Sequence, residues 1–239
     1  MNFTDIFGIK KHDVVSIVGC GGKTSLIGLL AKENSDRKVL VTTTTKIFPM
    51  SGENIFLCTT NDDVTKHLPQ NGINCLGIID SSTGKLSGID ERVLYDIAPN
   101  YDLTLIESDG SRGLPCKGWS DHEPVVVDFT SYTVGVVTFG GLGKAVTEEN
   151  VLRIDEFIKL TDLNYSDTIS IENIADMICK PEGMFKNSVG KKYLFINKIE
   201  DVNGIEFVAE LERAIGENYV GVLDDIFYGS VKNKTIMRV

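Results

Sequence analysis

The segment from Val14 to Ala31 constrains the fold of this chain more than any other. Apolar and β-branched residues lead into a glycine-rich turn, Gly19 to Gly22, which closes on Lys23 and is followed by an apolar stretch. This order predicts a buried strand, an anion-binding loop and a helix. The backbone N–H groups of the loop and the helix N-terminus would converge on a phosphate, and the lysine would add a fixed positive charge.

The glycine-rich loop is shorter than the common phosphate-binding pattern G-x-x-x-x-G-K-[ST]. That pattern requires a glycine where this chain has Ile17, whereas counting from Gly19 gives a G-x-x-G-K-T loop that is two residues shorter. The short form resembles the ATP-binding loop of the Mur-type amide ligases. A glycine-rich turn that binds nothing is the alternative, and the adjoining strand, Lys-Thr pair and helix argue against it. The residues expected to contact a nucleotide are Gly19, Gly21, Gly22, Lys23, Thr24 and Ser25.

Composition places the chain among soluble globular proteins. Its 239 residues are 42% apolar and 24% charged, which suits one large α/β domain or two small ones. The net charge of −10 argues against a nucleic-acid-binding surface. No apolar run is long enough for a membrane span, and the N-terminus lacks the layout of a signal peptide. We therefore expect a cytoplasmic protein with no nucleic-acid or membrane partner.

Five cysteines are scattered through the chain without a C-x-x-C pair. This spacing favours reduced, buried thiols over a disulfide framework or a zinc site. Cys20 stands apart, because a thiol at a helix N-terminus can have a lowered pKa. A redox role would also require exposure to solvent, and we expect a structural thiol at this position.

A second apolar strand, Tyr101 to Ile106, runs into an acidic sequence that suits a magnesium site. In this interpretation Glu107 binds the metal or the attacking water, Asp109 acts through water, and Arg112 supplies charge to the transition state. A solvated strand end is the alternative interpretation of such a sequence. Because this acidic sequence occurs together with the predicted phosphate loop, we favour the magnesium site.

Residues 42–46 are four threonines and a lysine, and they follow a short buried strand. Ligands of open α/β sheets bind at the carboxyl ends of the strands. We therefore expect the hydroxyl of Thr43 to join Thr24 and Glu107 as a metal ligand. The alternative is that the β-branched threonines extend the strand.

A third buried strand, Tyr193 to Ile196, runs into Asn197, Lys198 and, two positions later, Glu200. This N-K-x-[DE] sequence resembles the guanine-specificity motif of GTPases, in which an acidic side chain accepts hydrogen bonds that adenine cannot offer. GTP and ATP are both open as ligands, with guanine favoured. A strand ending in a polar turn is the alternative.

The remaining pattern predicts alternating strands and helices without a linker or repeat. Strands are expected at 55–58, 75–79, 133–139 and 219–223, helices at 62–68, 90–98, 171–179 and 205–215, and a hairpin turn at 81–85. A further helix is expected after Thr147, over 151–158. Residues 115–124 include His122 and Glu123 and suit an exposed loop. Recognition of a partner or substrate is open there beside a purely structural loop, and a metal site is disfavoured.

These features together predict a single three-layer α/β domain over residues 1–239, similar to the P-loop NTPases. Its sheet is expected to be mostly parallel, with helices on both faces. The stretch from residue 50 to residue 100 is expected to be an insertion at the edge of the sheet.

Taken together, these motifs resemble the YqeC family, described as selenium-dependent hydroxylase accessory proteins or selenium-cofactor biosynthesis proteins. The resemblance covers most of the chain and is carried by 18–24, 42–46, 107–115, 117–119, 122–124 and Asn197-Lys198. It implies a role in maturing selenium-dependent molybdenum hydroxylases. A molybdenum hydroxylase, or its cofactor-maturation proteins, would then be the partner.

The primary functional hypothesis is a maturation factor that binds Mg²⁺ and slowly hydrolyses GTP or ATP. Lys23 would hold the β- and γ-phosphates, and catalysis would consist of positioning and electrostatics. One alternative is a ligase or kinase that passes the γ-phosphate to a small molecule. Another is a carrier that binds a nucleotide or a pterin cofactor without turnover.

Overall fold

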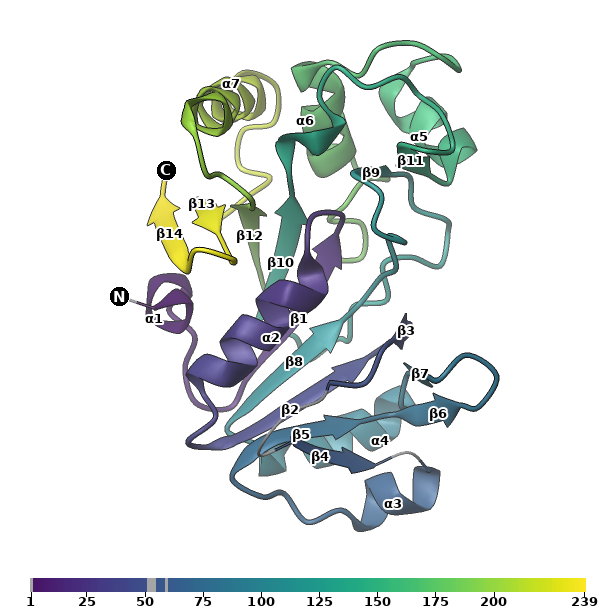
Figure 1. Ribbon diagram of the computed structural model, residues 1–239, viewed down its shortest axis with the longest axis vertical. Helices are drawn as coiled ribbons and strands as arrows, with labels where there is room; N and C mark the ends of the chain where they lie inside the picture. Colours follow the sequence, from purple (N-terminus) through teal and green to yellow (C-terminus); the bar gives the residue numbers. More distant parts are fainter. Residues whose placement is uncertain (1, 51–54, 59) are drawn as a thin grey trace.

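The structure, a computed structural model, describes residues 2–50, 55–58 and 60–239. Within these residues nine strands form one sheet, in which β1 is central and only β14 is antiparallel to its neighbour (Figure 1). The predicted α/β fold with a mostly parallel sheet is confirmed. The strands lie in the order β14 (Thr235–Arg238), β13 (Asp225–Ser230), β12 (Lys191–Ile196), β10 (Tyr132–Val137), β1 (Asp13–Gly19), β8 (Leu103–Glu107), β2 (Lys38–Thr43), β5 (Gly72–Leu76) and β4 (Ile55–Cys58).

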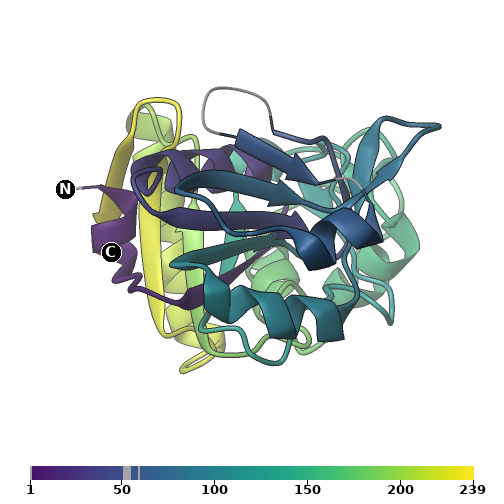
Figure 2. The same ribbon diagram turned by 90° about the horizontal axis from the view of Figure 1, so that it is seen from below.

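Helices cover both faces of this sheet (Figure 2). They are α1 (Phe3–Phe7), α2 (Lys23–Glu33), α3 (Asn61–Lys66), α4 (Glu91–Ile97), α5 (Ile154–Thr161), α6 (Ile171–Cys179) and α7 (Val202–Asn218), with 3₁₀ turns at Ala98–Asn100 and Phe139–Gly141. The apolar sides of α1 and α2 pack on one face, and those of α4, α6 and α7 on the other. Among the described residues, none of the helices has the length and apolar character that crossing a bilayer requires.

Strand β1 is buried on both faces, as the centre of a parallel sheet should be. Val15 and Ile17 pack with α1 and α2, while Val14 and Val18 belong to the apolar clusters of the opposite face. This alternation follows from the two-residue period of a strand. Because β1 pairs with both β8 and β10, the turn that follows it emerges in the middle of the sheet edge.

The carboxyl ends of the central strands meet at that same edge (Figure 1). Glu107, the last residue of β8, pairs with Ile17 of β1 and with Thr43 of β2. Asn197 directly follows β12. The parallel register therefore gathers the three strand ends that the sequence singled out, at the edge where open α/β sheets bind ligands.

Two smaller sheets lie near this edge (Figure 1). They are the antiparallel set β3 (Lys46–Ile47), β7 (Lys85–Ser87) and β6 (Ile78–Asp80), and the parallel pair β9 (Cys116–Lys117) and β11 (Val151–Leu152). The predicted hairpin turn at 81–85 is confirmed, and β4 and β5 extend the main sheet. Residues 51–54 and 59 of the expected edge insertion lie outside the described residues.

Two predicted elements are wrong, and the strand expected at 75–79 is divided between β5 and β6, which lie in different sheets. Residues 219–223 form no strand, and the chain ends instead with β13 and β14. The helix expected after Thr147 begins only at Ile154, because Val151 and Leu152 pair with β9 as strand β11. Short apolar runs do not reveal in sequence which distant strand they will pair with, so these elements were misassigned.

Candidate functional site

The glycine-rich loop between β1 and α2 has a backbone that only glycine adopts readily. Gly19 and Gly22 have φ angles of 100° and 105°, in a region that side chains disfavour. A Cβ on Gly22 would lie 2.8 Å from Nδ2 of Asn197, and one on Gly19 would lie 2.5 Å from the carbonyl oxygen of Val136. Helix α2 begins at Lys23, so its unpaired backbone N–H groups lie at the loop.

Lys23 and Thr24 contact the carboxylate that ends β8. The Thr24 hydroxyl donates to Oε2 of Glu107 at 2.8 Å, and Nζ of Lys23 lies 3.9 Å from Oε1. Lys23 also donates to the carbonyl oxygen of Gly19 at 2.6 Å. With 2% of its side chain exposed, the ammonium group is held at a fixed point. The structure thus brings the loop lysine, the hydroxyl and the carboxylate together.

Asp109 is fully buried against the loop and is enclosed by donors. The N–H of Gly19 donates to both carboxylate oxygens at 3.1 Å. Nζ of Lys23 lies 3.3 Å away, Nζ of Lys117 lies 3.0 Å away, and the indole N–H of Trp119 donates at 2.7 Å. These partners offset the cost of burying the charge. The buried carboxylate of Asp109 therefore links the loop to Lys117 and Trp119.

The contacts of Asp109 continue towards α5 through alternating charges. Nζ of Lys117 lies 2.8 Å from Oε2 of Glu123. Arg153, the residue before α5, contacts the same carboxylate with both terminal nitrogens, at 2.7 and 2.9 Å. The sequence marked Lys117 only within the family resemblance and gave Arg153 no role, because their side chains meet Asp109 and Glu123 only after the chain folds back.

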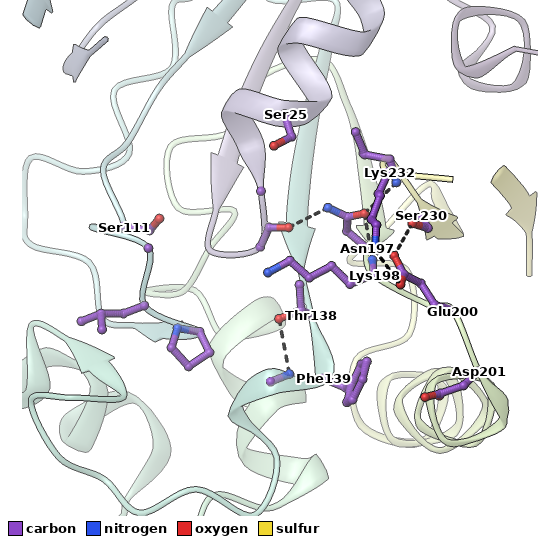
Figure 3. A pocket seen from close by; sticks show the side chains of 17 residues that line it. Ser25, Ser111, Thr138, Phe139, Asn197, Lys198, Glu200, Asp201, Ser230 and Lys232 are labelled. Carbon is purple, nitrogen blue, oxygen red and sulfur yellow. Dashed lines mark hydrogen bonds and ion pairs between the residues drawn. The ribbon is translucent and has the colours of Figure 1, made fainter. Parts of the chain in front are cut away.

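The side chain of Asn197 joins the glycine-rich loop to the end of β12 (Figure 3). Its Nδ2 donates to the carbonyl oxygen of Gly21 at 2.8 Å, and its Oδ1 accepts from the N–H of Val231 at 3.1 Å. The hydroxyl of Ser230 donates to Oε1 of Glu200 at 2.8 Å. Ser230 is the last residue of β13, and Val231 follows it. Sequence reasoning missed both residues because it did not predict this strand.

Two pockets open on either side of the first turn of α2. The first, here called the loop pocket, has a volume of about 700 Å³ and includes Ser25. The second has a volume of about 740 Å³ and includes Thr24. Ser111 and Gly113 line both. The loop pocket is further lined by Gly21, Gly22, Thr138, Phe139, Asn197, Lys198, Glu200 and Lys232 (Figure 3).

Three other residues singled out by the sequence have distinct placements. The buried hydroxyl of Thr43 donates to the carbonyl oxygen of Glu107 at 2.8 Å and accepts from the N–H of Thr45, a placement that favours its structural interpretation. Arg112 is exposed and lines the second pocket. Burial raises the pKa of Cys20 to about 12, so this thiol stays protonated and unreactive at neutral pH.

The Thr24 hydroxyl and the Glu107 carboxylate are two oxygen ligands of the kind that would fit a magnesium ion. Mg²⁺ prefers oxygen ligands and commonly uses one or two protein groups, with waters and substrate phosphates completing its shell. Both side chains line the second pocket and touch each other. In the part of the chain that the structure describes, no group of three or more His, Cys, Asp or Glu side chains could hold a metal ion. Magnesium here would therefore need further oxygen ligands from outside the described His, Cys, Asp and Glu side chains.

The burial of Glu107 has a consequence for stability. Burial raises its pKa above the ordinary value of 4.5, although Lys23 and the Thr24 hydroxyl lower it in part. A pKa raised by folding contributes stability below the unfolded pKa, and this contribution is lost as pH rises through the folded pKa. We therefore expect Glu107→Gln to gain stability relative to the wild type as the pH rises above 4.5.

Urea unfolding of both proteins in metal-free buffer, from about pH 4 to pH 8, measures this difference. A difference that stays constant over the range, or that shrinks as the pH rises, would contradict the expectation. Glu206→Gln, an exposed position on α7, serves as the control variant.

The fold and the site define an α/β protein with a strand, glycine-rich loop and helix at the carboxyl edge of a parallel sheet. A sequence model of the YqeC protein family matches residues 15–155. The chain is also 31% identical over 228 residues to "Uncharacterized protein YqeC" of Escherichia coli (strain K12), a match that covers 90% of this chain and 88% of that protein. The chain therefore belongs to the YqeC family, which confirms the resemblance found in its motifs.

Proposed function

We propose that this protein binds GTP with Mg²⁺ and hydrolyses it slowly. One observation carries the proposal: the hydrogen bond from Asn197 to the carbonyl oxygen of Gly21 ties the phosphate loop to the N-K-x-[DE] strand end. The two segments are walls of one pocket of about 700 Å³, a size that suits a small-molecule ligand.

The phosphate end of the proposed site is the loop and the first turn of α2. Backbone N–H groups and Lys23 would bind the β- and γ-phosphates, as glycine loops before helices do. Thr24 would bind the magnesium ion, and Glu107 would hold the metal or one of its waters. Magnesium would supply charge stabilisation to the phosphates when bound.

The base end of the proposed site is the segment around Glu200. Guanine presents N–H donors at N1 and N2, which a carboxylate accepts, whereas adenine presents an acceptor at N1. The Ser230 hydroxyl holds Oε1 of Glu200 in place, and Nζ of Lys232 lies 3.9 Å from Oε2. Guanine would donate hydrogen bonds from N1 and N2 to this positioned carboxylate and adenine would not, and this difference favours GTP over ATP.

Slow turnover follows from how Glu107 is held. Thr24 donates to its carboxylate and Lys23 lies beside it, so the carboxylate serves the metal more readily than an attacking water. Positioning and electrostatics supply most of the catalysis in phosphoryl transfer. Arg112 is exposed in the loop after β8, and it would add charge to the transition state only after moving towards the γ-phosphate.

Isothermal titration calorimetry with GTP and with ATP, in magnesium buffer, tests the proposal. We expect GTP to bind more tightly than ATP. In Glu200→Ala, GTP binding should weaken about tenfold or more, because a hydrogen bond to a charged group contributes about 1.5–3 kcal/mol. ATP binding should change by no more than about twofold, since adenine gains nothing from the carboxylate.

Glu217→Ala, at the far end of α7, is the matched control and should leave both affinities unchanged. If neither nucleotide binds at high micromolar concentration, the proposed function is wrong. Equal binding of GTP and ATP would overturn the guanine preference alone. Phosphate release from GTP in the same samples tests hydrolysis, and its absence would favour a carrier.

From the family resemblance we further propose an accessory role in maturing selenium-dependent molybdenum hydroxylases. In this role, nucleotide binding at the proposed site would control contact with a molybdenum hydroxylase. Gel filtration of the purified pair with and without GTP tests this role, and the absence of a complex in both conditions would count against it.

A further inference from the structure

The second pocket beside α2 is lined by four basic side chains from four separate segments. Lys46 belongs to β3, Lys85 to β7, Arg112 to the loop after β8, and Arg153 precedes α5. We call it the cationic pocket. Its walls also include the apolar side chains of Ile47, Phe48 and Leu152. Four converging cations are notable in a chain whose net charge is −10, because they concentrate positive potential in one cavity.

Two of these four cations lack an acidic partner among the described residues. Lys46 pairs with Asp80 at 2.7 Å, and Arg153 pairs with Glu123. By contrast, Nζ of Lys85 lies 4.9 Å from the centre of the Phe48 ring and makes no ion pair within the described part of the chain.

Arg112 likewise makes no side-chain hydrogen bond or ion pair with the residues that the structure describes. The acidic residues in the wall, Glu107 and Glu123, are already engaged with Thr24 and with Lys117 and Arg153. The cavity therefore presents unneutralised positive charge, and anions are the ligands that this charge attracts.

The position of the cationic pocket relates it to the proposed nucleotide site. Thr24 and Glu107, which would hold the magnesium ion, form part of its wall. It shares Ser111 and Gly113 with the loop pocket on the other side of α2. A ligand in the cationic pocket would thus lie next to the terminal phosphate of a bound nucleotide.

We propose that the cationic pocket binds a second ligand, a small organic anion with a phosphate or carboxylate group and an apolar body. The anionic group contacts Lys85 and Arg112, and the apolar body lies against Ile47 and Phe48. Its placement beside the nucleotide rests on the proposed function, whereas its binding to the basic side chains does not. Phosphate and carboxylate ligands both meet this description, because each has an oxyanion attached to an apolar group.

Phenyl phosphate is a suitable probe, because it joins a phosphate group to a planar ring. The protein is first saturated with Mg²⁺ and the non-hydrolysable analogue guanosine 5′-(β,γ-imido)triphosphate, which fills the phosphate loop. Phenyl phosphate, benzoate and the uncharged benzyl alcohol are then titrated by calorimetry. We expect phenyl phosphate or benzoate to bind and benzyl alcohol not to bind, and the comparison of the two anions distinguishes phosphate from carboxylate ligands.

Lys85→Glu should weaken binding of the anionic probe by about tenfold or more, because it replaces a charge-assisted contact by repulsion. Lys85→Arg should restore most of the affinity, since it keeps the charge. Lys10→Glu, at an exposed position before β1, reproduces the same change in net charge away from the pocket. It should leave probe binding unchanged.

The outcomes separate this inference from the proposed function. If the triphosphate analogue binds but no anionic probe does, or if Lys85→Glu and Lys10→Glu weaken the probe equally, the second ligand site is wrong and the nucleotide site stands. If the analogue does not bind, the proposed function is wrong. The probe titrations are then repeated without nucleotide. Weaker probe binding to Lys85→Glu than to Lys10→Glu supports the second ligand site, and equal or absent binding contradicts it.

Discussion

Asp109→Asn is expected to lower the free energy of unfolding by about 3–5 kcal/mol, because removing one partner leaves buried charges uncompensated. The carboxylate is fully buried, with Nζ of Lys117 at 3.0 Å and Nζ of Lys23 at 3.3 Å. The amide keeps the volume of the side chain but not its charge. The two ammonium groups would then rely on other carboxylates. Oε2 of Glu123 lies 2.8 Å from Nζ of Lys117, but Oε1 of Glu107 lies 3.9 Å from Nζ of Lys23. Urea unfolding monitored by circular dichroism measures the loss.

Asp80→Asn is the matched control for this substitution. Asp80 pairs with the exposed Lys46 at the surface, and exposed pairs contribute little to stability. The control should therefore unfold almost as the wild type does. A loss for Asp109→Asn as small as that of the control would show that the buried charges are not coupled.

Lys117→Met, made alone and combined with Asp109→Asn, provides a second test. It removes one of the two ammonium groups, so the double variant should be less destabilised than the sum of the two single variants. Additive losses in this cycle would contradict a direct interaction between Asp109 and Lys117.

Lys23→Ala is expected to weaken binding of the triphosphate by about 100-fold or more, since two charge-assisted hydrogen bonds to phosphate contribute about 1.5–3 kcal/mol each. Nζ of Lys23 is held by the carbonyl oxygen of Gly19 at 2.6 Å, so the ammonium group is placed before any ligand arrives. Calorimetry with GTP and Mg²⁺ measures the change. Thermal unfolding of the same sample establishes that the variant is folded at the temperature of the titration.

Two further variants sharpen this test. Lys32→Ala changes an exposed lysine of the same helix and should bind as the wild type does. Lys23→Arg keeps the charge but places a larger, planar group in a site where the side chain is 2% exposed, so it should restore little binding. If folded Lys23→Ala binds GTP with wild-type affinity, the glycine-rich loop is not part of a nucleotide site.

Much of the fold could be predicted from the sequence, because long apolar strands and amphipathic helices have distinct periods. The helix over 171–179 and the strand over 55–58 lie where the sequence placed them. Elements that depend on a distant partner were not predictable in this way. The strand β11 is two residues long and exists only because β9 pairs with it, and β13 lies at positions where the sequence suggested no strand.

The same distinction holds for the site: the positions of the strand ends were predictable, and the roles of single side chains were not. Each strand end that the sequence singled out does reach the same edge, because parallel register places Glu107 opposite Ile17 and Thr43. The roles of individual side chains were not readable from their positions. The hydroxyl of Thr43 bonds to backbone, and the carboxylate of Asp109 faces inward.

The strand, glycine loop and helix around Gly19 to Thr24 could be predicted from local sequence, because they depend on residues that are close along the chain. The side chains that surround this loop come together only in the folded protein. Lys117 reaches Asp109 from the segment after β8, and Ser230 reaches Glu200 from the end of β13. Such contacts join residues whose spacing in sequence carries no period, so only the packed sheet could bring them together.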